Sequence, residues 1–144
     1  MSAVAALLAV ASVVGCGPFS PPMPDATVER VELVEVGEEA ASYRLHLAID
    51  NAHDEPLPLT LAAYTLTVDG VTYTTDTVPD ATLPSQRRLT LTLPGVTENG
   101  GRVGSPYQAQ GSLIVDPPGQ VRQFFYEMGV PRPRIRFTGE GTVE

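Results

Sequence analysis

The sequence has a single cysteine, few basic residues and no apolar run long enough to cross a membrane. One cysteine, Cys16, cannot form an internal disulfide. All nine basic residues are arginines, and the 17 acidic residues that outnumber them give a formal net charge of −8. Nucleic-acid phosphates require a basic surface, so we expect no nucleic-acid partner.

Catalytic and metal-binding motifs are also lacking. No Gly-x-Ser-x-Gly elbow is present, and a zinc site needs three or four converging ligands, whereas the chain has only two histidines. We interpret His53, with Asp50, Asp54 and Glu55 nearby, as part of a solvated turn, and His46 as an exposed cross-strand partner. We therefore expect no enzyme, no catalytic residue, no metal and no cofactor.

The N-terminus is typical of a bacterial lipoprotein signal. An uncharged apolar run, residues 3–11, leads to Val13-Val14-Gly15-Cys16, and small residues before a cysteine are what a lipoprotein signal peptidase requires. About 13 apolar residues are fewer than the roughly 20 that a membrane-spanning helix needs. We interpret residues 1–15 as a signal peptide and Cys16 as the lipidated residue, which would carry diacylglycerol and acyl chains such as palmitate. A basic residue normally precedes such a run, but only Met1 and Ser2 do so here. The position of the true start codon is therefore left open.

Residues 16–26 form the expected tether between the lipid and the folded domain. Four prolines between Gly17 and Asp25 favour an extended segment, which at about 3 Å per residue spans roughly 30 Å. Gly17 is not the acidic residue of an inner-membrane retention signal. We therefore expect an anchor in the outer membrane that faces the periplasm, or at the cell surface in a bacterium with one membrane.

Beyond the tether, residues 27–144 show apolar residues at every second position. Ser42 to Asn51 alternates cleanly, which is typical of a half-buried strand. The parity of the apolar residues then changes, which predicts a β-bulge near Ala62-Ala63, and Asp69-Gly70 indicates a hairpin turn. This reasoning predicts seven strands, at 27–36 (with a slip at Leu33-Val34), 42–51, 57–68, 71–75, 88–93, 107–115 and 134–143.

Seven short strands and no long amphipathic helix predict an all-β fold, an antiparallel β-sandwich of immunoglobulin or fibronectin III type with one short helix. The helix is expected from Gly119 to Met128, where apolar residues recur at helical spacing before the stop signals Gly129 and Pro131. We expect its apolar face to cover one open end of the sandwich. The alternative is a helix that stands off the body and offers a hydrophobic docking patch.

Arg132, Arg134 and Arg136 are the candidate binding residues, because they share one face of the last predicted strand. Such a row could bind lipid phosphate or an acidic partner. The interpretation we favour is that it pairs with neighbouring carboxylates or protects an edge strand from aggregation.

The sequence also resembles the late embryogenesis abundant (LEA) type 2 family, known for its water-stress and hypersensitive-response domain. The resemblance rests on residues 43–59, where a strand ends at the turn residue Asn51 and a Pro-containing apolar stretch follows, and on the strand Tyr64-Thr65-Leu66-Thr67-Val68. Leu83-Pro84-Ser85 before residues 89–94 is similar to the family's turn-and-strand pattern. The resemblance implies a seven-stranded sandwich with a small helix, a role in desiccation or envelope stress, and no catalytic residue.

Together these observations lead us to expect a monomeric, non-enzymatic, lipid-anchored protein of the cell envelope. It would protect or bind other envelope components under desiccation or other stress. Two alternatives stay open: an assembly or adhesion subunit that pairs a sheet edge with a partner strand, and a carrier of a small lipid or ligand between the sheets.

Overall fold

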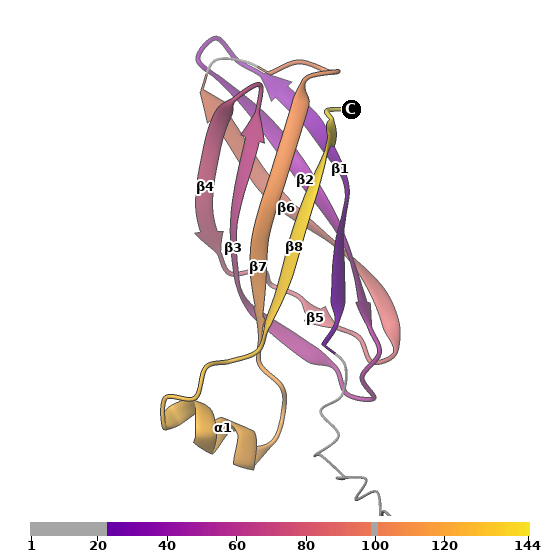
Figure 1. Ribbon diagram of the computed structural model, residues 1–144, viewed down its shortest axis with the longest axis vertical. Coiled ribbons are helices and arrows are strands. Elements are labelled where there is room, and N and C mark those ends of the chain that lie inside the picture. Colours follow the sequence, from indigo (N-terminus) through magenta and orange to yellow (C-terminus); the bar gives the residue numbers. More distant parts are fainter. Residues whose placement is uncertain (1–22, 99–100) are drawn as a thin grey trace, which may run out of the picture.

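The computed structural model describes residues 23–98 and 101–144, which form eight strands and one helix (Figure 1). The elements in chain order are β1 (Asp25–Val36), β2 (Ala40–Asn51), β3 (Leu57–Val68), β4 (Val71–Thr77), β5 (Thr82–Leu83), β6 (Arg87–Glu98), β7 (Pro106–Val115), α1 (Gln120–Glu127) and β8 (Arg134–Thr142).

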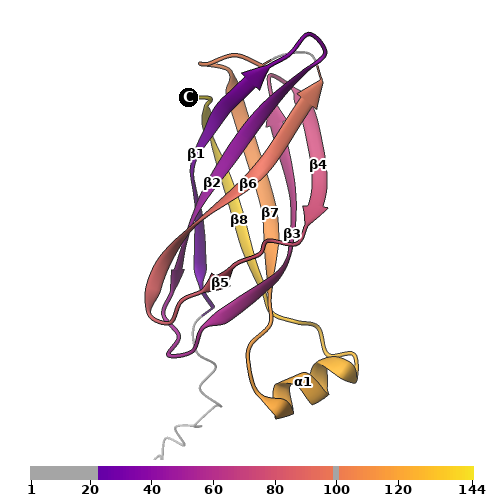
Figure 2. The same ribbon diagram turned by 180° about the vertical axis from the view of Figure 1, so that it is seen from behind.

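The strands form two antiparallel sheets that pack face to face. One sheet has the order β1-β2-β6, and the other has the order β4-β3-β7-β8 with β5 added to β3. Figures 1 and 2 show the two layers as an elongated sandwich with α1 at one end. The predicted all-β antiparallel sandwich with one short helix is therefore confirmed.

Seven strands were predicted, and the structure has eight among the described residues. The additional strand, β5, has two residues, which pair with Leu57 and Pro58 of β3. Two residues are too few to display a period, so alternation could not reveal this strand. At the N-terminal side β1 begins at Asp25, two residues before the predicted domain boundary, and Ala26 is already buried. The predicted signal peptide and Cys16 lie outside the described residues.

The parity changes seen in the sequence correspond to irregular strand pairing. In β1 the register with β2 shifts between Leu33 and Glu35, where a slip was expected, and again between Val28 and Arg30. In β3 the register with β7 shifts between Leu59 and Leu61, slightly earlier than the predicted bulge at Ala62-Ala63. Both strands thereby turn a second set of apolar residues toward the interior.

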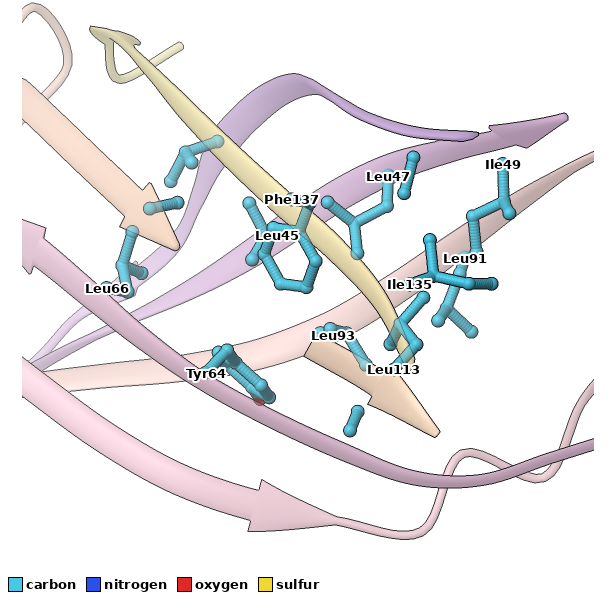
Figure 3. Close-up of a cluster of buried hydrophobic side chains, with 14 of the residues drawn as sticks. Leu45, Leu47, Ile49, Tyr64, Leu66, Leu91, Leu93, Leu113, Ile135 and Phe137 are labelled. Carbon is cyan, nitrogen blue, oxygen red and sulfur yellow. The ribbon is translucent and has the colours of Figure 1, made fainter. Parts of the chain in front are cut away.

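The core lies between the two sheets and consists of the residues that alternate inward. Leu45, Leu47 and Ile49 of β2 are 0% exposed. Figure 3 shows side chains from both sheets pointing toward one another in this layer. Its labelled members are Leu45, Leu47, Ile49, Tyr64, Leu66, Leu91, Leu93, Leu113, Ile135 and Phe137.

The sheets also meet directly along one side, where β1 lies against β8. A Cβ atom at Gly139 of β8 would lie 2.5 Å from the Cβ of Val28, so only glycine permits this approach. Further along, the backbone of Glu144 bonds to β1, with Leu33 N–H donating to its carbonyl (2.9 Å) and its own N–H donating to Val31 (2.9 Å). The outer edge of β8 is therefore partly covered.

In the part of the chain that the structure describes, no helix has the length and apolar character needed to cross a bilayer.

We predict that Leu47→Asp prevents folding. An unpaired charge at this fully buried position costs several kcal/mol, against a total stability of about 5–15 kcal/mol for a typical domain. Circular dichroism and thermal melting measure the effect. The matched control is Thr90→Asp on the adjacent strand β6, where the side chain is exposed. Cooperative melting of Leu47→Asp near the wild-type temperature would show that the facing of β2 is wrong.

Candidate functional site

The most unusual surface of the protein is the apolar face of α1. Val121, Phe124, Phe125 and Met128 are 69%, 57%, 50% and 68% exposed, and no residue of α1 is buried. The expectation that this helix covers an open end of the sandwich is therefore wrong. The alternative, a helix that stands off the body, describes the structure, and Figures 1 and 2 show α1 projecting beyond the sheets.

The helix faces outward because its polar side makes the contacts with the sandwich. Arg122 Nη1 donates to Glu55 Oε2 (3.1 Å), and Gln123 Nε2 donates to Asp116 Oδ1 (2.9 Å). Arg132 donates to the same Asp116 oxygen (3.2 Å), and its guanidinium carbon lies 5.2 Å from the ring centroid of Tyr126. At 100° per residue, Arg122, Gln123 and Tyr126 lie opposite the apolar face.

The ends of α1 differ in how they are stabilised. At the C-terminal end Gly129 has φ 93°, and the N–H groups of Gly129 and Val130 donate to Tyr126 and Phe125 (3.1 and 3.0 Å), which is a Schellman motif. At the N-terminal end Gly119 provides no side-chain cap. Since an isolated helix of eight residues is marginal in water, its contacts with Glu55 and Asp116 are needed to hold it in place.

A shallow depression lies where the segment that follows α1 meets β3, β7 and β8. It combines apolar side chains with two cationic ones, and its lining includes Leu61, Ile114, Val130, Pro131, Arg132 and Arg134.

The three candidate arginines are all exposed, but they do not form one row on the strand. Arg132 precedes β8 and forms the ion pair with Asp116. Arg134 lies opposite Ile114 and Arg136 opposite Ser112, and neither forms an ion pair among the described residues. Of the three arginines, only Arg132 pairs with a carboxylate. β8 is an edge strand of its sheet, as expected. That the three residues bind lipid phosphate or an acidic partner stays a prediction.

His46 is a cross-strand partner, as expected, but it is mostly covered. Its Nε2 lies 3.0 Å from Glu32 Oε2 on β1, and its Nδ1 lies 3.3 Å from the Thr92 hydroxyl on β6. These neighbours leave its side chain 12% exposed.

The His53 segment is a turn organised by Asn51, which is buried. Asn51 Oδ1 accepts from the His53 N–H (3.0 Å), and its Nδ2 donates to the carbonyls of Glu55 (3.3 Å) and Pro84 (3.0 Å). Within residues 23–98 and 101–144, no group of three His, Cys, Asp or Glu residues is placed to hold a metal ion.

The clear electrostatic effects belong to surface pairs and to two core tyrosines, Tyr64 and Tyr107, since burial raises the pKa of both. The hydrogen bond from His46 lowers the pKa of Glu32, and the two bonds from Arg88 (both 2.9 Å) lower the pKa of Asp50. Burial raises the pKa of Tyr64, whose hydroxyl donates to the Pro94 carbonyl. These groups support the fold, since Glu32 and Asp50 tie neighbouring strands and Tyr64 spans the two sheets.

Comparisons with known proteins identify the fold. No protein-family model and no curated protein matches the sequence. A solution structure of an Arabidopsis thaliana protein is similar to this one with a TM-score of 0.63 and 18% identity, over 85% of this chain and 82% of that chain. The solution structure of a putative late embryogenesis abundant (LEA) protein is similar with a TM-score of 0.63 and 17% identity, over 84% of this chain and 70% of that chain. A crystal structure of a protein from Archaeoglobus fulgidus is similar with a TM-score of 0.51 and 12% identity, over 80% of this chain and 94% of that chain.

These similarities define the class of structure. The chain has an LEA type 2 fold, as the sequence resemblance implied.

We predict that the Glu32 and Asp50 pairs make stability sensitive to acid. Because both pKa values are lowered in the folded state, the ionised groups stabilise the fold above about pH 4, and this is lost as the pH falls through the folded-state values. Between about pH 5 and 2, the melting temperature should therefore fall less steeply for the double variant Glu32→Gln/Asp50→Asn than for the wild type. Glu38→Gln, an exposed position in the β1–β2 turn, is the control. Equal slopes for the double variant and the wild type would contradict the prediction.

Proposed function

We propose that this chain is a non-enzymatic, lipid-anchored protein of the bacterial envelope that protects or binds other envelope components during desiccation or related stress. The observation that carries the proposal is an LEA type 2 fold that follows a sequence typical of a lipoprotein signal. The fold likeness supports the stress-related part, and the Val13-Val14-Gly15-Cys16 sequence supports the anchor.

The proposed anchor places the domain close to the bilayer. Gly17 to Pro24 are the only residues between Cys16 and the start of β1. At about 3.1 Å per residue, the rise of a polyproline II helix, the nine steps from Cys16 to Asp25 would span about 28 Å. Diacylglycerol on Cys16 would hold the protein in the outer membrane, facing the periplasm.

The surface of the sandwich suits weak contacts with many partners. The outer side of the five-stranded sheet presents hydroxyl and amide groups, among them the hydrogen-bonded pairs Thr65 with Thr74 (3.1 Å) and Thr67 with Thr72 (3.0 Å). A formal charge of −8 favours solubility at high local concentration. Such a surface can exchange hydrogen bonds to water for hydrogen bonds to neighbouring proteins as water is withdrawn.

A second candidate function is partner binding through a sheet edge. β4 is the terminal strand of its sheet and pairs with β3 alone, so its other edge could accept a partner strand. Stoichiometric co-purification with one envelope protein would favour this candidate. No observation supports the third alternative, a ligand carrier. Buried side chains occupy the space between the sheets (Figure 3).

We predict that Cys16→Ser abolishes lipidation. In a bacterial host fed labelled palmitate, the wild-type chain should be labelled and should partition with membranes, whereas the variant should be unlabelled and retain the signal peptide. Palmitate labelling and mass spectrometry of the N-terminus measure both effects. A wild-type chain that takes up no palmitate label, or a Cys16→Ser chain that is labelled and cleaved like the wild type, would refute the anchor.

We predict that the mature domain preserves the activity of a reporter enzyme through drying or heating. The weak polar contacts described above should keep partly unfolded enzyme molecules apart, so recovered activity should rise with domain concentration. Leu47→Asp, expected to be unfolded, serves as the control of equal composition. Recovery no better than with an equal mass of an unrelated acidic protein would contradict the protective role.

A further inference from the structure

The start of the folded domain and α1 lie at the same end of the sandwich. β1 begins where Asp25 pairs with Asp50 at the end of β2, and α1 follows the end of β7, where Val115 pairs with Leu59 near the start of β3. Figures 1 and 2 agree that α1 and the first residues of β1 share this end, while the C-terminus lies at the other end.

The proposed anchor therefore enters the domain from the side on which the apolar face of α1 is exposed. The segment from Cys16 to Asp25 would span about 28 Å in a polyproline II conformation. A lipidated Cys16 would therefore hold the bilayer near the end of the domain that carries α1.

The charges of the described residues differ between the two ends. The end away from α1 is acidic, with Arg102 as its one basic residue, and its carboxylates are Glu35, Glu38, Glu39, Asp69, Glu98, Glu140 and Glu144. The α1 end is less acidic, because five arginines stand beside its seven carboxylates. The arginines are Arg87, Arg88, Arg122, Arg132 and Arg134, and the carboxylates are Asp25, Asp50, Asp54, Glu55, Asp80, Asp116 and Glu127. An anionic bilayer repels the first end more strongly, so the charge distribution turns the α1 end toward the lipid.

We propose that the α1 end is a bilayer-docking surface, in which Val121, Phe124, Phe125 and Met128 enter the boundary between headgroups and acyl chains of the membrane that holds Cys16. This inference rests on the lipid anchor of the proposed function. It makes the protein's attachment two-part: covalent lipid retains the chain, and α1 fixes the orientation of the domain.

The chemistry of the surface fits lipid. Interfacial helices bury an apolar face, often with Trp, Phe or Leu, about 5–10 Å into the boundary between headgroups and acyl chains. Phe124 and Phe125 lie edge to face with their centroids 6.1 Å apart. Arg134 lines the depression together with Leu61 and Ile114. In the docked orientation it would lie at headgroup level, where its guanidinium can bind lipid phosphate.

The absence of tryptophan from the chain permits a direct test. Phe125→Trp places a single indole on the docking face (50% exposed), and Val103→Trp places one at the opposite end, in a more accessible position (67% exposed). Met128→Trp is a second reporter on the docking face, should Phe125→Trp impair folding. Each full-length acylated protein is reconstituted into vesicles of phosphatidylethanolamine and phosphatidylglycerol, with or without brominated phosphatidylcholine, which quenches indoles that reach the acyl chains.

We predict that the brominated lipid reduces the fluorescence of Phe125→Trp by about twofold or more, as expected for insertion to interfacial depth, and leaves Val103→Trp nearly unchanged. Acylated, vesicle-bound protein in which neither indole is quenched would overturn the inference and leave the anchor intact. Equal quenching of both indoles would overturn the proposed orientation. A Phe125→Trp indole that is shielded without lipid, together with concentration-dependent dimers, would assign the face to a second copy of the chain. Absence of acyl chains on Cys16 would overturn both the anchor and this inference.

Discussion

The face-to-face packing of two sheets through side chains at every second position is the constraint on which the rest of the structure depends. A single cysteine leaves the chain without an internal disulfide, so the interior formed by residues such as Leu45, Leu66 and Phe137 must hold the layers together. The β1 and β8 edges add to this where Gly139 admits Val28 and where Glu144 bonds to β1. The result is a rigid frame whose two ends can carry different chemistry.

The α1 end shows how a helix can be attached without joining the core. Its contacts are with charged side chains. Glu55 in the β2–β3 turn is distant in the sequence, whereas Asp116 and Arg132 lie in the segments that flank the helix. Polar contacts at a partly exposed surface are individually weak, but several of them on one side of a short helix determine which side faces the body. The apolar side is then exposed because the polar side is occupied.

Local sequence periodicity predicts the strands better than it predicts the placement of α1. Alternation in Ser42 to Asn51 and the turn at Asp69-Gly70 determine β2 and the β3–β4 hairpin locally, and the structure agrees. The two-residue β5 has no period to read. Helical spacing of Phe124, Phe125 and Met128 predicts an amphipathic helix, but amphipathicity does not specify which face meets the body. That choice depends on Arg122 meeting Glu55, 67 residues away in the sequence.

Exposed apolar side chains on one short helix would favour self-association in a freely diffusing protein. The same exposure would have a different consequence if, as proposed, a lipid on Cys16 kept a bilayer close to the start of β1. Such an anchor would restrain distance but not orientation, because the domain could rotate about it. The proposed second contact at the same end would remove that freedom and direct the acidic end, with Glu38, Asp69 and Glu140, away from the lipid. In the proposed arrangement, the surface available to other envelope proteins is therefore the charged, hydrated part of the sandwich, which is the part suited to weak protective contacts.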